Sequence, residues 1–125
     1  MTLGLSCHEI RVKSNGYGSA VDVTPMLRRC AEGIERGLMN AYVSEEDAAL
    51  VTIEYERGLL EDLKKFVEEY MKAFRGLAPT ILGRSLDLPI VNGNIRLGTW
   101  QQVVFIDLGH RAREVSIYVT IIYED

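Results

Sequence analysis

The sequence predicts an α+β fold with mostly antiparallel strands, formed by a single domain over residues 1–125. Three observations support this prediction. Strand patterns cluster toward both ends of the chain, helix patterns lie between them, and the regular alternation of strand and helix that marks parallel βαβ units is missing. A chain of 125 residues suits one core, and no repeat, low-complexity tract or linker divides it.

The first third of the chain predicts a hairpin followed by a helix. Residues 3–14 alternate loosely between apolar and polar side chains, and a glycine-rich loop separates them from a short strand at residues 20–23. Thr24 and Pro25 suit the start of a helix, with Thr24 as its cap. Gly37 is the expected end of that helix.

The middle of the chain predicts two strands and a long helix. Residues 38–43 and 48–53 read as strands on either side of an acidic turn. Residues 56–75 predict the helix, which Gly76 ends. Its apolar residues fall on one face at steps of three and four: Leu59, Leu60, Leu63, Phe66, Val67, Tyr70, Met71 and Phe74. Residues 78–88 are ambiguous, and a second, shorter helix from Pro79 to Leu82 is one interpretation.

The end of the chain predicts a turn and three strands. Residues 89–93 contain the turn, and the strands are expected at residues 95–100, 102–108 and 114–124. The last strand alternates strictly, which indicates one buried face. That face is expected to pack either against the long helix or against a second sheet.

Composition argues against several classes of protein. The formal net charge of −4 disfavours nucleic acid or a membrane surface as the main partner. No signal peptide or membrane-spanning stretch is expected, which predicts a cytoplasmic location. Cys7 and Cys30 lack the spacing of a metal knuckle or redox pair and are expected to be small core residues. Nucleotide-binding and hydrolase motifs are also absent from the sequence.

Several short segments together resemble the YjbQ-like family of small proteins. They are Gly58-Leu59-Leu60-Glu61-Asp62, Ile81-Leu82-Gly83-Arg84-Ser85, Leu88-Pro89-Ile90 and Leu97-Gly98-Thr99-Trp100-Gln101. Gly109, Arg111 and Arg113 are similar to the family's closing Gly-x-Arg-x-Arg. The resemblance covers nearly the whole chain. It implies an α+β fold built on a β-sandwich and a homotrimer, and members have been named secondary thiamine-phosphate synthases.

The resemblance also shows where the chain departs from the family. The family's Pro-His-Thr-Thr-Ala stretch aligns with residues 44–48, which places Glu45 at a family histidine. The family's Asn-Ala-His-x-His stretch aligns with residues 72–76, which places Phe74 and Gly76 at the positions of two more family histidines. Those histidines could bind a metal or move protons, so this chain is predicted to be a divergent member that has lost the histidine site. Glu54 still matches a family glutamate and is the candidate catalytic residue.

Two further pairs of residues are candidates for binding a ligand. Thr99 and Gln101 lie two apart in an expected strand, so they are expected to share a face and line a polar pocket, with Trp100 turned into packing. The alternative is that they stabilise a sheet edge or a subunit contact. Arg111 and Arg113 are candidates to clamp a phosphate or carboxylate, with Arg96 as a third arginine that could join them. Intersubunit salt bridges or a solvated turn are the alternatives for these arginines.

The acidic residues are the basis of an alternative hypothesis, a site for a divalent metal. No cofactor is predicted, but Glu45, Asp47 and Glu54 supply oxygen ligands of the kind that a divalent metal prefers. A solvated turn explains most of the same cluster. The leading hypothesis is therefore a homotrimer that binds a small anionic molecule near Glu54, Thr99, Gln101, Arg111 and Arg113. The other hypotheses are a weak thiamine-phosphate-synthase-type enzyme with a carboxylate-bound metal and a non-catalytic structural assembly subunit.

Overall fold

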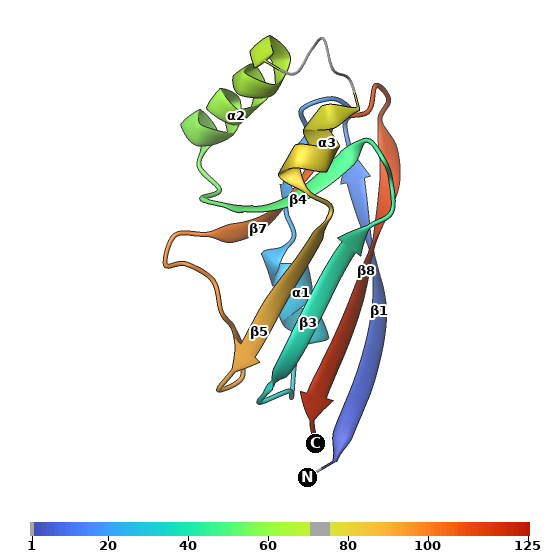
Figure 1. The fold of residues 1–125 in the computed structure, drawn as a ribbon, viewed down its shortest axis with the longest axis vertical. Coiled ribbons are helices and arrows are strands. Elements are labelled where there is room, and N and C mark those ends of the chain that lie inside the picture. The colour runs from blue at the N-terminus through green and yellow to red at the C-terminus, as the bar shows by residue number, and fades with distance from the viewer. Residues whose placement is uncertain (1, 71–75) are drawn as a thin grey trace.

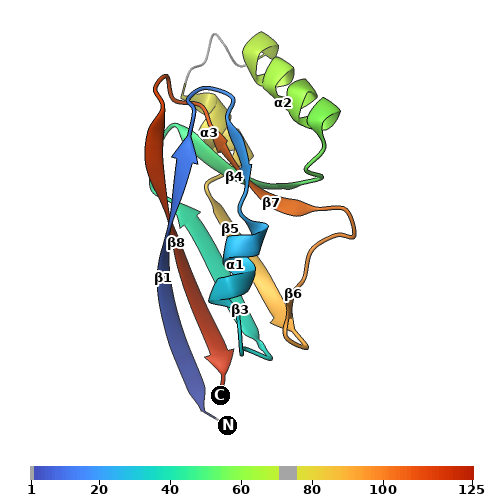
Figure 2. The same ribbon diagram turned by 180° about the vertical axis from the view of Figure 1, so that it is seen from behind.

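Within its described residues, the chain forms two antiparallel sheets that pack as a sandwich, with three helices around them (Figure 1). The computed structural model describes residues 2–70 and 76–125. The α+β fold with mostly antiparallel pairing is therefore confirmed. The two termini lie close together at one end of the molecule, because the first and last strands are paired antiparallel neighbours (Figure 2).

The larger sheet, sheet A, contains the two longest strands. β1 (Leu3–Ser14) and β8 (Arg113–Glu124) pair over their whole lengths. β3 (Gly37–Val43) pairs with the other edge of β8, β5 (Ser85–Val91) pairs with β3, and β6 (Asn94–Ile95) is the last strand. The apolar alternation of the last strand is confirmed in sheet A by four buried residues: Val115, Ile117, Val119 and Ile121.

The smaller sheet, sheet B, is built around a strand that is buried on both faces. Its order is β2 (Ala20–Asp22), β7 (Gln102–Asp107) and β4 (Ala48–Ile53). Val103 and Phe105 of β7 belong to the core shared with sheet A, whereas Val104 and Ile106 belong to a second apolar cluster on the other face. A continuous apolar run suits a strand covered on both sides. Of the two predicted ways of covering sheet A, the structure shows the second sheet.

The first helix is shorter than the sequence predicts. α1 (Thr24–Cys30) covers the inner face of sheet A where sheet B does not reach (Figure 2), and the expected continuation to Gly37 is wrong. Gly33 has a φ of +79°, which reverses the chain and lets Ile34 pack into the core. Thr24 does not cap the helix either, since its hydroxyl accepts the Val103 N–H at 2.8 Å.

The long helix lies on the surface instead of forming the core. α2 (Arg57–Tyr70) and α3 (Leu77–Leu82) lie over the outer face of sheet B (Figure 1), and Leu60 and Leu63 contact the Val104 cluster. Val67 is the one buried residue of α2. Other members of its predicted apolar face are half exposed: Leu59 39%, Phe66 49% and Tyr70 68%. The predicted end of this helix, with Met71 and Phe74, falls outside the described residues. The short helix predicted from Pro79 is confirmed as α3.

Near the end of the chain, the turn predicted within residues 89–93 is confirmed, and the strand expected at residues 95–100 is wrong. β5 occupies part of the ambiguous segment and extends through Pro89, which lacks the N–H that strand pairing uses. Asn92 and Gly93, with φ values of 53° and 78°, then form a tight hairpin to β6. The strand expected at residues 95–100 is only β6, because the following residues turn instead of extending.

Three smaller findings complete the fold. Cys7 is exposed on sheet A, contrary to its expected core position, whereas Cys30 is partly buried and packs against the core. Trp100 is 74% exposed, so its predicted packing is also wrong. Among the described residues, no helix is both long and apolar enough to cross a membrane.

Candidate functional site

The predicted site residues divide between the two ends of sheet B. Strand β4 starts directly after Asp47 and ends directly before Glu54, and β7 runs antiparallel beside it. Six residues of strand cover roughly 20 Å. We call the two ends of the sheet the Asp47 end and the Glu54 end. Arg111 and Arg113 follow β7 at the Asp47 end, and Gln101 precedes β7 at the Glu54 end.

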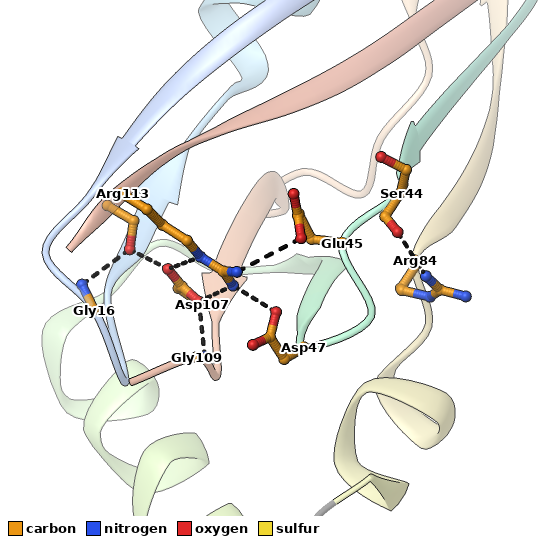
Figure 3. A network of polar contacts seen from close by, with 9 residues as sticks. Gly16, Ser44, Glu45, Asp47, Arg84, Asp107, Gly109 and Arg113 are labelled. Atoms are coloured by element: carbon orange, nitrogen blue, oxygen red, sulfur yellow. Dashed lines mark hydrogen bonds and ion pairs between the residues drawn. The ribbon is translucent and has the colours of Figure 1, made fainter. Parts of the chain in front are cut away.

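A hydrogen-bonded ion cluster, the Asp107 network, dominates the Asp47 end (Figure 3). Asp107 terminates β7, and its side chain is fully buried. It accepts hydrogen bonds from the Ser14 hydroxyl and from the Gly109 N–H, the latter at 2.8 Å. Arg113, the first residue of β8, donates to both of its oxygens, at 2.6 Å and 3.2 Å. The network therefore joins the ends of β1 and β7 to the start of β8.

The guanidinium of Arg113 also contacts two carboxylates of the acidic turn. Its Nη2 lies 2.7 Å from an oxygen of Asp47, and its Nη1 lies 3.6 Å from an oxygen of Glu45. Figure 3 shows the guanidinium between Asp107 and these two side chains. A cation that is shared among three carboxylates has little charge left for an external anion. The structure thus places Arg113 in an internal ion cluster, which leaves Arg111 as the better anion contact of the pair.

The pKa values within the network follow from these contacts. Burial by itself raises the pKa of Asp107, but hydrogen bonds from Arg113, Ser14 and Gly109 outweigh it. The pKa of Asp107 therefore lies below the ordinary value for an aspartate. The hydrogen bond to Asp107 raises the pKa of Arg113, against the opposing effect of burial. Both groups consequently stay charged near neutral pH.

Arg111 and His110 lie in the turn between β7 and β8, and both are exposed. Within the part of the chain that the structure describes, Arg111 makes no ion pair with a carboxylate. The backbone of Arg111 packs beside Gly16, whose loop connects β1 to β2. His8, the other histidine, is distant along β1 and lies 2.6 Å from the Ser6 hydroxyl.

At the Glu54 end, three predicted residues come together on the surface. Ile53 pairs with Gln102, so Glu54 and Gln101 flank the same point of the β4–β7 ladder. Thr99 and Gln101 do not share a strand face, because residues 98–101 form a turn closed by a 2.9 Å bond from the Gln101 N–H to the Gly98 carbonyl. Glu54, Thr99 and Gln101 are all exposed beside Trp100.

The three carboxylates proposed as metal ligands are not gathered in one chain. Glu45 and Asp47 contact Arg113, whereas Glu54 lies beyond the other end of β4. No group of three or more His, Cys, Asp or Glu side chains within residues 2–70 and 76–125 is arranged to hold a metal ion. An Arg113 that neutralises two of the three would also compete with a divalent cation.

Two hollows adjoin the Asp107 network. The larger, which we call the groove, has a volume of about 810 Å³. Its lining residues come from α2, α3 and the turns at the Asp47 end: Tyr17, Glu46, Asp47, Val67, Glu68, Glu69, Gly76, Ala78, Pro79, Leu108 and His110. The smaller hollow, of about 400 Å³, is bounded by residues 44–47 and Arg113. Glu45 and Gly76, which align with family histidines, thus each border a hollow.

Asp107 and Ser14 are the structural centre that sequence reasoning missed. The sequence pattern places Ser14 at the end of the alternating segment 3–14 and Asp107 in the strand expected at residues 102–108, and it predicts no functional role for either. The sequence does contain one indication of this centre. Asp107 directly follows the apolar run of residues 103–106, and a charged residue at the end of a buried strand needs a partner of opposite charge or hydrogen-bond donors. Nothing in the sequence identifies Arg113 as that partner.

Comparison with known proteins shows which family has this architecture. The fold matches a YbjQ-like protein of unknown function from Sulfolobus solfataricus with a TM-score of 0.90 and 27% identity, covering 98% of this chain and 100% of that one. The sequence model of the family described as UPF0047 protein YjbQ-like matches residues 8–122. The chain belongs to the YjbQ-like UPF0047 family. The resemblance carried by the Leu-Gly-Thr-Trp-Gln segment and its flanking motifs is therefore confirmed.

Relatives extend the YjbQ-like assignment across most of the chain. A UPF0047 protein of Archaeoglobus fulgidus is 33% identical over 123 residues, which cover 87% of this chain and 97% of that protein. A protein of solved structure from Aeropyrum pernix is 28% identical with a TM-score of 0.87, covering 94% of this chain and 98% of the other. These similarities show that the chain has the fold of the YjbQ-like family.

Proposed function

We propose that this YjbQ-like protein is a homotrimer that binds a small phosphate- or carboxylate-bearing molecule between neighbouring subunits. The observation that carries the proposal is the separation of its exposed polar side chains. Arg111 lies at the Asp47 end of sheet B, and Thr99 and Gln101 lie at the Glu54 end. One small ligand contacts both groups only where the Glu54 end of one subunit meets the Asp47 end of the next.

In this site Arg111 supplies the positive charge. A guanidinium without an internal carboxylate partner binds a phosphate or carboxylate through two parallel hydrogen bonds. Thr99 and Gln101 add neutral hydrogen bonds from a surface turn. Trp100 beside them is a large exposed aromatic side chain that covers the ligand or the subunit contact. Glu54 is the candidate proton acceptor of this end.

The outer face of sheet A supports assembly. Leu5, Ile122 and Leu38 stand in register on three adjacent strands and are 66%, 51% and 47% exposed. A contiguous apolar row of this kind is typical of a surface that another protein covers. We propose that the trimer buries this row. Light scattering on the purified protein is expected to give the mass of three chains, and a monomer at micromolar concentration would contradict the assembly.

Arg111→Ala is expected to weaken binding of inorganic phosphate, or of the best small carboxylate in a screen, by roughly 10- to 100-fold, the cost of one charged hydrogen-bonded contact. Isothermal titration calorimetry measures this directly. Arg28→Ala is the matched control, since Arg28 is an exposed arginine on α1. Equal affinity in wild type and Arg111→Ala, or binding by no compound in the screen, would overturn the proposed anion site.

A further inference from the structure

We infer that the groove under α2 and α3 is a second binding site, which takes a small organic cation with an apolar body. Its volume of about 810 Å³ lies in the range of small-molecule sites, roughly 300–1,000 Å³. The inference goes beyond the anion site and does not depend on it, because the groove is lined by different side chains.

The floor of the groove is apolar. Val67 of α2 and Ala78 of α3 are 6% and 4% exposed and form one apolar cluster with the neighbouring Leu108. Pro79 continues this surface. A floor of this composition favours burial of a hydrocarbon or aromatic group by the hydrophobic effect.

The rim of the groove is negatively charged. Its ionisable lining residues are four carboxylates with Tyr17 and His110. Asp47 is compensated by Arg113 at 2.7 Å, but Glu46, Glu68 and Glu69 make no ion pair among the described residues. Among the described residues, these three carboxylates without an ion-pair partner favour a cation over an anion at the apolar floor.

Tyr17 completes the wall opposite α2. Tyr17 lines the groove, and both burial and the charge of the nearby Glu68 carboxylate raise the pKa of its phenol. An aromatic face beside carboxylates is a favourable setting for an ammonium group, which interacts with the ring through its quadrupole. Size, floor, charge and aromatic wall thus all fit one class of ligand.

The test titrates the ¹⁵N-labelled protein with benzyltrimethylammonium, benzyl alcohol and phenylacetate, which share an aromatic body but differ in charge. The cation is expected to shift the amide signals of Val67, Ala78 and Leu108 and to bind more tightly than the other two. Glu68→Gln/Glu69→Gln is expected to weaken cation binding about tenfold, the combined effect of two partly exposed carboxylates.

The matched control is Glu61→Gln/Asp62→Asn, which removes the same charge from α2 outside the groove lining. This control is expected to keep the wild-type affinity for the cation. Arg111→Ala is also expected to keep it, which would show that the groove and the anion site are separate. Equal weakening by both double variants, equal affinity for benzyl alcohol, preference for phenylacetate, or shifts confined to residues away from the groove would each overturn the inference.

Discussion

Replacing Arg113 with methionine is expected to lower the free energy of unfolding by about 3–5 kcal/mol, the cost of removing one partner of a buried ion pair. The side chain of Asp107 is fully buried, and Arg113 donates to both of its oxygens. Methionine fills much of the same volume, but among the described residues it leaves the Asp107 charge with Ser14 and Gly109 as its remaining donors. Urea unfolding followed by circular dichroism measures the loss.

Arg111→Met is the control for this prediction, and it is expected to change stability by no more than about 0.5 kcal/mol because Arg111 is exposed.

The dependence of stability on acidic pH provides a second measurement of the same ion pair. The folded pKa of Asp107 lies below its unfolded value of about 3.9, so its stabilisation is present above that value and is lost as pH falls through the folded pKa. Arg113→Met is expected to show a smaller loss in acid. Wild-type stability in Arg113→Met would mean that Arg113 is free to bind a ligand.

Phe105→Ala is expected to cost about 3–5 kcal/mol, the range for truncating a buried aromatic residue in a packed core. Phe105 is fully buried in the central strand of sheet B and packs in the core that both sheets share. Truncation leaves a cavity between the sheets that the paired strands on either side are too rigid to fill. The shift of the urea midpoint at constant slope gives the value.

Leu59→Ala on α2 is the comparison for this core. Leu59 is 39% exposed, so its truncation removes less buried surface and is expected to cost well under half as much as Phe105→Ala. A larger effect at Leu59 than at Phe105 would show that the long helix, and not the contact between the sheets, holds the fold together.

The sequence predicts the elements whose apolar residues recur at a regular spacing. It does not predict the elements that depend on pairing with a distant strand. The alternation of residues 114–124 and the period of the long helix identified β8 and α2. The same period overstated the burial of α2, since an amphipathic pattern shows which face is apolar but not how much of it is covered. β5 was missed because Pro89 argues locally against a strand, whereas pairing with β3 stabilises one.

The candidate site shows the same limit more sharply. Sequence spacing placed Arg111 and Arg113 on equal terms, but only the fold shows that Arg113 points at Asp107 and Asp47. Thr99 and Gln101 were identified by their motif, and their distance from the arginines follows from the length of β7, which spacing along the chain does not reveal. Contacts between residues far apart in sequence determine which polar groups remain free for a ligand.

Mixing two defective chains shows whether the ligand site is shared between subunits. Arg111→Ala and Gln101→Ala proteins, each impaired in anion binding, are unfolded together in equal amounts and refolded. In a cyclic trimer, random assembly restores about a quarter of the sites, because each needs an intact Arg111 from one chain and an intact Gln101 from its neighbour. Tight binding at about that stoichiometry is the predicted calorimetric result. A mixture that binds no better than its two components would show that Arg111 and Gln101 of neighbouring chains do not form one site.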